Sequence, residues 1–81
     1  MPVIKIKKDQ INNGLNIIDL SIKTNLFSSK SEIRRLINGN AIKINNQVIT
    51  DDKFLIEQSL FIDSYLKLSV GKKKHLRVEL N

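Results

Sequence analysis

Apolar and polar positions alternate near both ends of the chain, as they do in half-buried strands. Residues 3–7 set two isoleucines against lysines, which predicts a short edge strand. In residues 66–70 and 76–80, leucine or valine stands at every second position, and Gly71 lies between the two segments. This pattern predicts a C-terminal β-hairpin with one apolar and one polar face.

The middle of the chain has a helical period. Residues 17–24 place apolar side chains around most of a helix's circumference, which predicts a first helix buried on more than one side. Asn16 is suited to cap its start, and Asn25 can end it in a left-handed conformation. Residues 8–14 are rich in turn formers and predict a connecting turn.

A second helix is predicted to begin after Ser29 and to end at Gly39. Ser29 and Glu32 stand three apart, so we expect a capping box. In it, the serine hydroxyl accepts from the Glu32 amide, and the glutamate carboxylate accepts from the Ser29 amide. Gly39 is expected to take the left-handed conformation that ends many helices.

This second helix has two chemically different sides. Ile33 and Ile37 lie on an apolar stripe. The other side carries positive charge and no carboxylate beyond the cap. Its cations are Lys30, Arg34 and Arg35. Such a side suits the phosphate backbone of a nucleic acid.

Two short strands are expected after the second helix. Residues 41–45 and 47–50 can pair through a tight turn at Asn45 and Asn46, because asparagine tolerates positive φ. Residues 54–58 fit a helical turn or a strand equally well.

Composition supports a single small domain, residues 1–81, with a polyanionic partner. The chain has 81 residues, a formal net charge of +6 and a pI near 9.9. The charge favours nucleic acid or an anionic membrane surface, although many small basic proteins bind neither. There is no cysteine and no apolar run approaching about 20 residues, so we expect no disulfide, thiolate metal site or membrane span.

A second basic cluster lies in the expected C-terminal hairpin. It consists of Lys72, Lys73, Lys74, His75 and Arg77. Tyr65 and Lys67 are expected on the same outward face of the partner strand. Cations neutralise phosphates and an aromatic ring can stack on an unpaired base, so this face suits RNA. A lysine run can also be a solvated turn that resists aggregation.

No motif in the chain predicts catalysis. There is no phosphate-binding loop, dinucleotide fingerprint or nucleophile elbow. His75 is the only histidine and has no cysteine or carboxylate cluster at ligand spacing. We therefore expect neither a catalytic residue nor a metal site.

Three segments together resemble a known family. They are SKSEIRRLI (29–37), NGNAIKINNQVI (38–49) and GKKKHLRV (71–78). The chain resembles the S-four-type RNA-binding domain, and within that family the C-terminal domain of bacterial tyrosyl-tRNA synthetases. The resemblance covers about residues 14–80. Asn25 and Asn46 stand where glycine is common in the family, and Ile33 stands where alanine is usual.

The resemblance implies an α+β, S-four-like (alpha-L) fold, with two packed helices on a small, mostly antiparallel sheet. Residues 1–13 would form the N-terminal strand and lead-in. It also implies that the chain is the C-terminal fragment of a larger cytoplasmic synthetase that attaches tyrosine to its tRNA. ATP and magnesium are expected only for the catalytic domain, so the fragment would need no cofactor. The parent is expected to be a homodimer and the fragment a monomer, without a membrane partner.

In the family this domain grips the tyrosine tRNA on its variable-arm and anticodon side. Carried over by position, the RNA contacts would fall on Ser29, Lys30, Ser31, Arg34, Arg35, Asn45, Lys72, Lys73, Lys74, His75 and Arg77. The Ser29–Ser31 amides, at a helix start, could bind a further phosphate.

Two alternatives remain open at this point. One is a free-standing S-four-type protein that acts on ribosomal RNA or ribosomes. The other is a small basic adaptor whose helix docks on an acidic protein.

Overall fold

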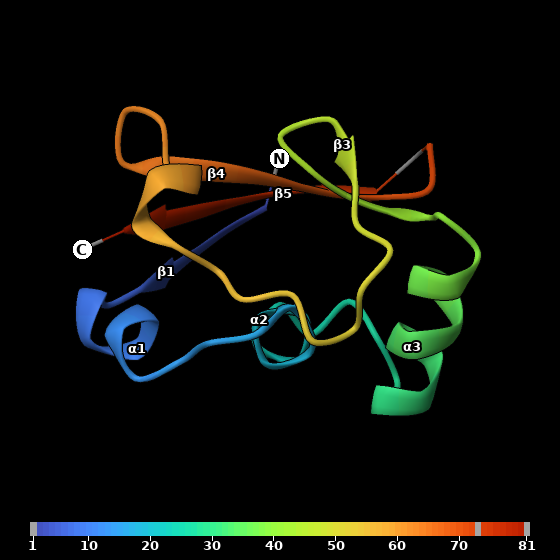
Figure 1. Ribbon diagram of the computed structural model, residues 1–81. Coiled ribbons are helices and arrows are strands. Elements are labelled where there is room, and N and C mark those ends of the chain that lie inside the picture. Colours follow the sequence, from blue (N-terminus) through green and yellow to red (C-terminus); the bar gives the residue numbers. More distant parts are fainter. Residues whose placement is uncertain (1, 73, 81) are drawn as a thin grey trace.

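The computed structural model describes residues 2–72 and 74–80 and shows a five-stranded sheet with helices on one side (Figure 1). The strands are β1 (Val3–Ile6), β2 (Ile42–Ile44), β3 (Gln47–Val48), β4 (Tyr65–Val70) and β5 (Lys74–Leu80). Their order across the sheet is β1-β5-β4-β2-β3. Only the β1–β5 pair is parallel, so the sheet is mostly antiparallel, as predicted.

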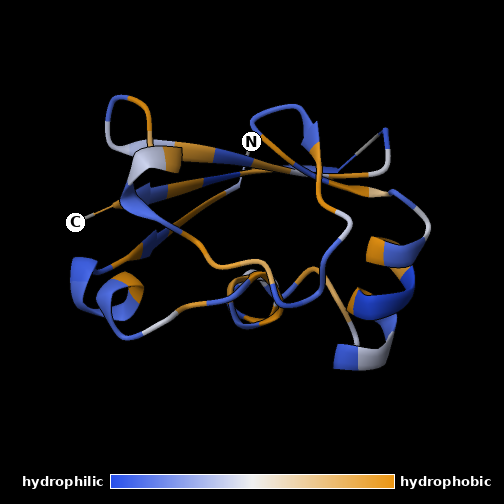
Figure 2. Cartoon of the chain, in the orientation of Figure 1, coloured by the Kyte–Doolittle hydropathy of each residue, from blue (hydrophilic) through white to orange (hydrophobic). Residues whose placement is uncertain are grey.

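The helices are α1 (Lys8–Asn12), α2 (Ile17–Lys23) and α3 (Lys30–Asn38), with a 3₁₀ turn, η1 (Gln58–Leu60). In Figure 1, α1 and α2 lie beneath the sheet and α3 covers its right-hand end. The apolar sides of the helices face the sheet (Figure 2). Between these layers lies a core of fully buried side chains that includes Ile17, Leu20, Ile33, Ile37, Leu66 and Leu68. No helix within residues 2–72 and 74–80 is long and apolar enough to cross a membrane.

The prediction of a simple turn over residues 8–14 is wrong, because α1 occupies most of this segment. The Lys7 amide donates to the Gln10 side-chain oxygen at 3.0 Å, which supports the first turn of the helix. Ile11 is buried in the core and fixes the helix against the sheet. The structure therefore has three helices where the resemblance implied two.

The cap of α3 is confirmed in one half only. The Ser29 hydroxyl accepts from the Glu32 amide at 3.2 Å, as predicted. The Glu32 carboxylate, however, accepts from the amide (3.4 Å) and the hydroxyl of Ser28 instead of from the Ser29 amide. Glu32 therefore bonds to two adjacent serines: its backbone amide donates to Ser29, and its carboxylate accepts from Ser28, one residue farther from the helix.

The expected left-handed Gly39 is also wrong. Gly39 has φ −87°, and the left-handed residue is Asn40, with φ 59°. The amide of Ala41 then donates to the Leu36 carbonyl at 2.9 Å, and the amide of Asn40 to Ile37 at 3.1 Å. These two bonds form a Schellman motif, in which the helix ends at Asn38 with Gly39 as its C-cap, so the predicted stop is confirmed and only the left-handed residue differs.

The other predicted turns are confirmed. Asn25, Asn45 and Asn46 have φ values of 59°, 51° and 70°. Residues 54–57 form neither a helix nor a named strand, although Leu55 makes an isolated bridge with Asn16, and Gln58 begins η1. The face of α2 around Ile22 is less buried than predicted, with that side chain 42% exposed.

Candidate nucleic-acid interface

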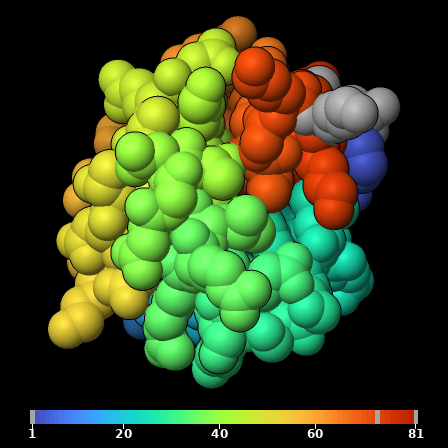
Figure 3. All heavy atoms as spheres, turned by 90° about the vertical axis from the view of Figure 1, so that its right-hand side faces the viewer, coloured from blue at the N-terminus to red at the C-terminus, as the bar shows by residue number. Residues whose placement is uncertain are grey.

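The tip of the β4–β5 hairpin lies beside α3 at one end of the molecule. Figure 3 faces this end and shows the green α3 next to the orange-red hairpin tip. Between them is a groove of about 430 Å³, with Leu36 on the α3 side and Val70, Lys72 and Lys74 on the hairpin side. Two of the predicted binding segments, far apart in sequence, are therefore brought together.

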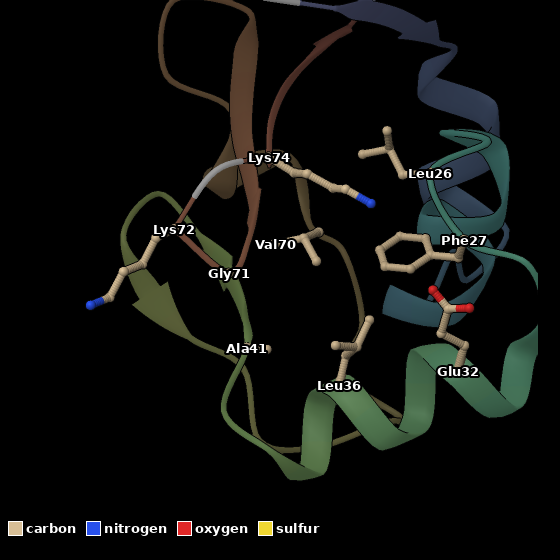
Figure 4. A pocket seen from close by; sticks show the side chains of 9 residues that line it. All are labelled: Leu26, Phe27, Glu32, Leu36, Ala41, Val70, Gly71, Lys72 and Lys74. Atoms are coloured by element: carbon tan, nitrogen blue, oxygen red, sulfur yellow. The ribbon is translucent and has the colours of Figure 1, made fainter.

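The charged side chains at this groove come from both elements. Lys74 extends across the groove towards Phe27, whereas Lys72 points away from it (Figure 4). Glu32 lines the α3 side, and Arg35 follows it by three positions on the same helix. The arrangement puts cations around a single carboxylate, and so leaves the region positive.

Hydrogen bonding explains the protonation behaviour of that carboxylate. The bonds from Ser28 hold the pKa of the Glu32 carboxyl below its ordinary value of 4.5, and the charges of Lys74 and Arg35 lower it further. Burial opposes this shift, but it is weaker than the hydrogen bonds. Glu32 thus stays ionised and acts as an acceptor at neutral pH.

We expect an NMR pH titration to give Glu32 a midpoint below 4.5, its ordinary pKa. Because the folded pKa is the lower one, the stabilisation that ionised Glu32 provides is present above the unfolded pKa and is lost as pH falls through the folded value. Ser28→Ala should move the midpoint back up, since it removes the largest cause of the shift. Ser59→Ala, in η1, serves as the matched control. An unchanged midpoint in Ser28→Ala would contradict this account.

The cations of α3 do not all face the groove. Arg34 Nε lies 3.7 Å from Asp52 Oδ2, and both side chains remain partly exposed. The helix itself carries no carboxylate beyond the cap, but Asp52 from a loop distant in sequence compensates part of the charge on this side. Lys30 borders a different hollow, with Asp19 and Lys23 of α2. Arg35, by contrast, lies close enough to Glu32 for its charge to act on that carboxylate, as does that of Lys74.

His75 and Arg77 lie on the open face of the sheet, away from the helices. His75 Nδ1 and Ser69 Oγ are 3.1 Å apart. Arg77 stacks over the Tyr65 ring, 3.9 Å from its centre, and its Nε lies 3.2 Å from Glu79. Tyr65, His75 and Arg77 share this face, as predicted, but Lys74 does not, because it extends into the groove beside α3. This face, however, is distinct from the α3 groove.

The other residues predicted to contact RNA lie in separate parts of the structure. Asn45 is half-buried: it donates to the Leu60 carbonyl at 2.7 Å and accepts from the Lys67 amide at 3.0 Å, so its side chain holds the fold together. Ser29 and Ser31 are exposed at the start of α3. Lys73 lies outside the described residues. The RNA contacts of all these residues stay predictions.

Sequence reasoning missed the apolar part of the groove. Phe27 is only half-buried and lines the groove with Leu26 and Leu36. No local signal could have separated this role from core packing. Within residues 2–72 and 74–80, no group of three or more histidine, cysteine, aspartate or glutamate side chains is placed to hold a metal ion.

Comparison with known proteins identifies the family of this chain. Residues 1–78 match the family model described as the tyrosine–tRNA ligase SYY-like C-terminal domain. The chain is 56% identical over 80 residues to the tyrosine–tRNA ligase of Pelagibacter ubique (strain HTCC1062), covering 99% of the chain and 20% of that protein. It is 42% identical over 79 residues to the ligase of Wolbachia sp. subsp. Brugia malayi (strain TRS), covering 96% and 19%. The chain thus spans about a fifth of the length of these relatives. It belongs to the family of tyrosine–tRNA ligase SYY-like C-terminal domains.

Proposed function

We propose that this chain is the tRNA-binding domain of a tyrosine–tRNA ligase, and that it holds the tyrosine tRNA by the phosphates of its variable-arm and anticodon side. The observation that carries the proposal is the meeting of α3 with the β4–β5 tip, where Lys72 and Lys74 line the groove and the charges of Lys74 and Arg35 both act on Glu32. Family membership supports the same partner.

The binding mechanism is electrostatic attraction to a shaped RNA backbone. The Arg35 guanidinium can make forked hydrogen bonds to phosphate oxygens, while Lys72 and Lys74 act as point charges. The carboxylate of Glu32 lies at the N-terminal end of α3 and repels a phosphate there. It therefore shifts the proposed phosphate contacts from the Ser29–Ser31 amides towards Arg35 and the hairpin.

The open sheet face provides a second set of cations. Arg77, with its neighbour Lys67 across the strands, can neutralise phosphates of an RNA that wraps past the hairpin tip. Arg77 is partly compensated by Glu79, so we assign it the weaker contacts. The aminoacylation chemistry, with its ATP and magnesium, belongs in this proposal to the rest of the ligase, and we assign no catalytic residue to this chain.

A titration with two tRNAs tests the proposal. The chain should bind tyrosine tRNA about tenfold more tightly than the same tRNA without its variable arm, because several phosphate contacts are lost with the arm. Gel shift or fluorescence anisotropy at fixed salt measures both constants. Equal affinities for the two tRNAs and for an unrelated RNA duplex would indicate general polyanion binding and refute the proposal.

The alternative function is a free-standing protein that acts on ribosomal RNA or ribosomes. It would use the same surface but has less support, because the relatives described above are tyrosine–tRNA ligases. A ribosomal RNA helix included as competitor distinguishes the two. If that helix displaces tyrosine tRNA at equal or lower concentration, the alternative is favoured.

A further inference from the structure

The groove between α3 and the hairpin tip contains more apolar surface than phosphate binding requires. Its apolar lining comes from Leu26, Phe27, Leu36, Ala41 and Val70. Its volume, about 430 Å³, falls within the range of small-molecule sites. Phosphates gain nothing from such walls, so the groove suits a flat and largely apolar group that accompanies a phosphate backbone.

Phe27 gives this groove an aromatic wall. Its side chain is half-buried and faces the space below Lys74 (Figure 4). The opposite side is aliphatic, with Val70 from the end of β4 and Leu36 from α3. An unpaired nucleobase stacks well on an aromatic ring, and each such stack contributes about 1–3 kcal/mol in single-stranded complexes.

Glu32 gives the groove an acceptor. Its two hydrogen bonds within the described residues both end on Oε2, which leaves Oε1 to accept from a ligand. Among the bases, guanine presents two adjacent N–H donors, at N1 and N2. Uracil presents one N–H between two carbonyl oxygens, which a carboxylate repels. Acceptor chemistry at this position therefore favours guanine over uracil.

The cations around the rim decide the class of occupant. Lys72 and Lys74 lie at the hairpin edge of the groove, and Arg35 lies beside Glu32 on α3. A base that enters the groove brings its own phosphates to this rim, where they are neutralised. An apolar protein side chain would fill the walls but would leave these charges without partners.

We propose that the groove between α3 and the β4–β5 tip is a nucleobase subsite, which takes one unpaired base of the bound RNA and prefers guanine. The base stacks against Phe27, and the Glu32 carboxylate accepts from its N–H groups. This inference rests on the proposed RNA-binding function and adds a base-specific contact to it. A surface that otherwise reads shape and charge then recognises one position in sequence.

The test uses the full chain with two fluorescein-labelled pentaribonucleotides, UUGUU and UUUUU, in anisotropy titrations. We expect UUGUU to bind about tenfold more tightly, since a good base contact is worth roughly 1–3 kcal/mol. Amide NMR shifts on adding UUGUU should centre on Phe27, Leu36 and Val70. Equal affinity for the two oligonucleotides, or shifts confined to the open sheet face, would overturn the proposal.

Two variants separate stacking from hydrogen bonding. Phe27→Leu keeps an apolar wall but removes the ring, and should weaken binding of both oligonucleotides about fivefold. Glu32→Gln keeps an oxygen for the Ser28 bonds but replaces the charged acceptor, and should reduce the preference for guanine to less than threefold. Phe61→Leu, a half-buried phenylalanine outside the groove, is the matched control and should leave both affinities unchanged.

Parallel titration with tyrosine tRNA separates this inference from the function on which it rests. If tRNA binds and depends on Arg35 and Lys74 while Phe27→Leu and Glu32→Gln change neither oligonucleotide affinity, the subsite is refuted and the proposed function stands. If tRNA does not bind at all, the proposed function fails. Circular dichroism of each variant tests whether it is folded. If Phe27→Leu does not fold, the loss of guanine preference in Glu32→Gln and the NMR shifts caused by UUGUU still test the subsite.

Discussion

Replacing both Arg35 and Lys74 with alanine is expected to lower the affinity for tyrosine tRNA by about 10–100-fold near 0.1 M salt. Both side chains are exposed, and their elements meet at one end of the molecule, so a single RNA backbone can contact both. Removing two phosphate contacts should also reduce the slope of log affinity against log salt by about two. Anisotropy titrations at four salt concentrations measure both quantities.

The matched control for that experiment removes the same charge elsewhere. Lys7 and Lys8 are exposed at the α1 end of the molecule, opposite α3 in Figure 1. Lys7→Ala with Lys8→Ala should change affinity by less than about threefold, through the lower net charge alone. If both double variants lose affinity equally, binding depends on overall charge and the proposed interface is wrong.

Arg34 offers a finer comparison within α3. Its ion pair with Asp52 is exposed and contributes little to stability, but it compensates part of the positive charge on that flank. Arg34→Ala should therefore cost less tRNA affinity than Arg35→Ala in the same titration. The reverse order would place the RNA on the Asp52 side of the helix.

Leu68→Ala is expected to lower the free energy of unfolding by about 3–4 kcal/mol. Leu68 is fully buried in β4, which pairs with both β5 and β2 at the middle of the sheet. The loss combines the transfer energy of the deleted groups with the cavity left behind. A domain of this size has a total stability of only about 4–12 kcal/mol, so much of its margin would disappear. Urea unfolding followed by circular dichroism measures the change.

Leu55→Ala is the matched control for this substitution. Leu55 is 54% exposed, so the same truncation removes little buried surface and should cost about 0.5 kcal/mol or less. A loss below about 1 kcal/mol in Leu68→Ala would mean that the core between sheet and helices is not packed as described.

Local chemistry was enough to predict most elements of this fold. Ser29 and Asn16 cap the helices that they were expected to cap, because a side-chain acceptor three residues before a free amide needs no tertiary context. The Asn45–Asn46 turn followed from the tolerance of asparagine for positive φ. Strict alternation around Gly71 likewise predicted the β4–β5 hairpin.

The predictions failed where contacts between residues distant in sequence, or a choice between equivalent neighbours, determine the local structure. The short helix α1 forms although its segment is rich in turn residues, since Ile11 gains burial against the sheet. The left-handed residue after α3 is Asn40 and not Gly39, because either of these two neighbouring residues could take that conformation.

The candidate site shows the same limit. The sequence identified the cations of α3 and of the hairpin, but not which of them share a side. The Asp52 contact with Arg34, and the opening of Phe27 into a groove, depend on loops that approach from elsewhere in the chain. Neither has a periodic or local pattern from which it could be read.

The parallel pairing of β1 with β5 sets an order for biosynthesis. Val3 is aligned with Arg77 and Ile6 with Leu80, so β1 cannot pair until β5 has been synthesised. Until then the backbone of β1 has no partner strand, while α3 and the β2–β3 hairpin can already form from residues near one another in the sequence. The sheet is therefore completed only after β5 has been synthesised, and a chain interrupted within β5 would leave β1 without a strand to pair with.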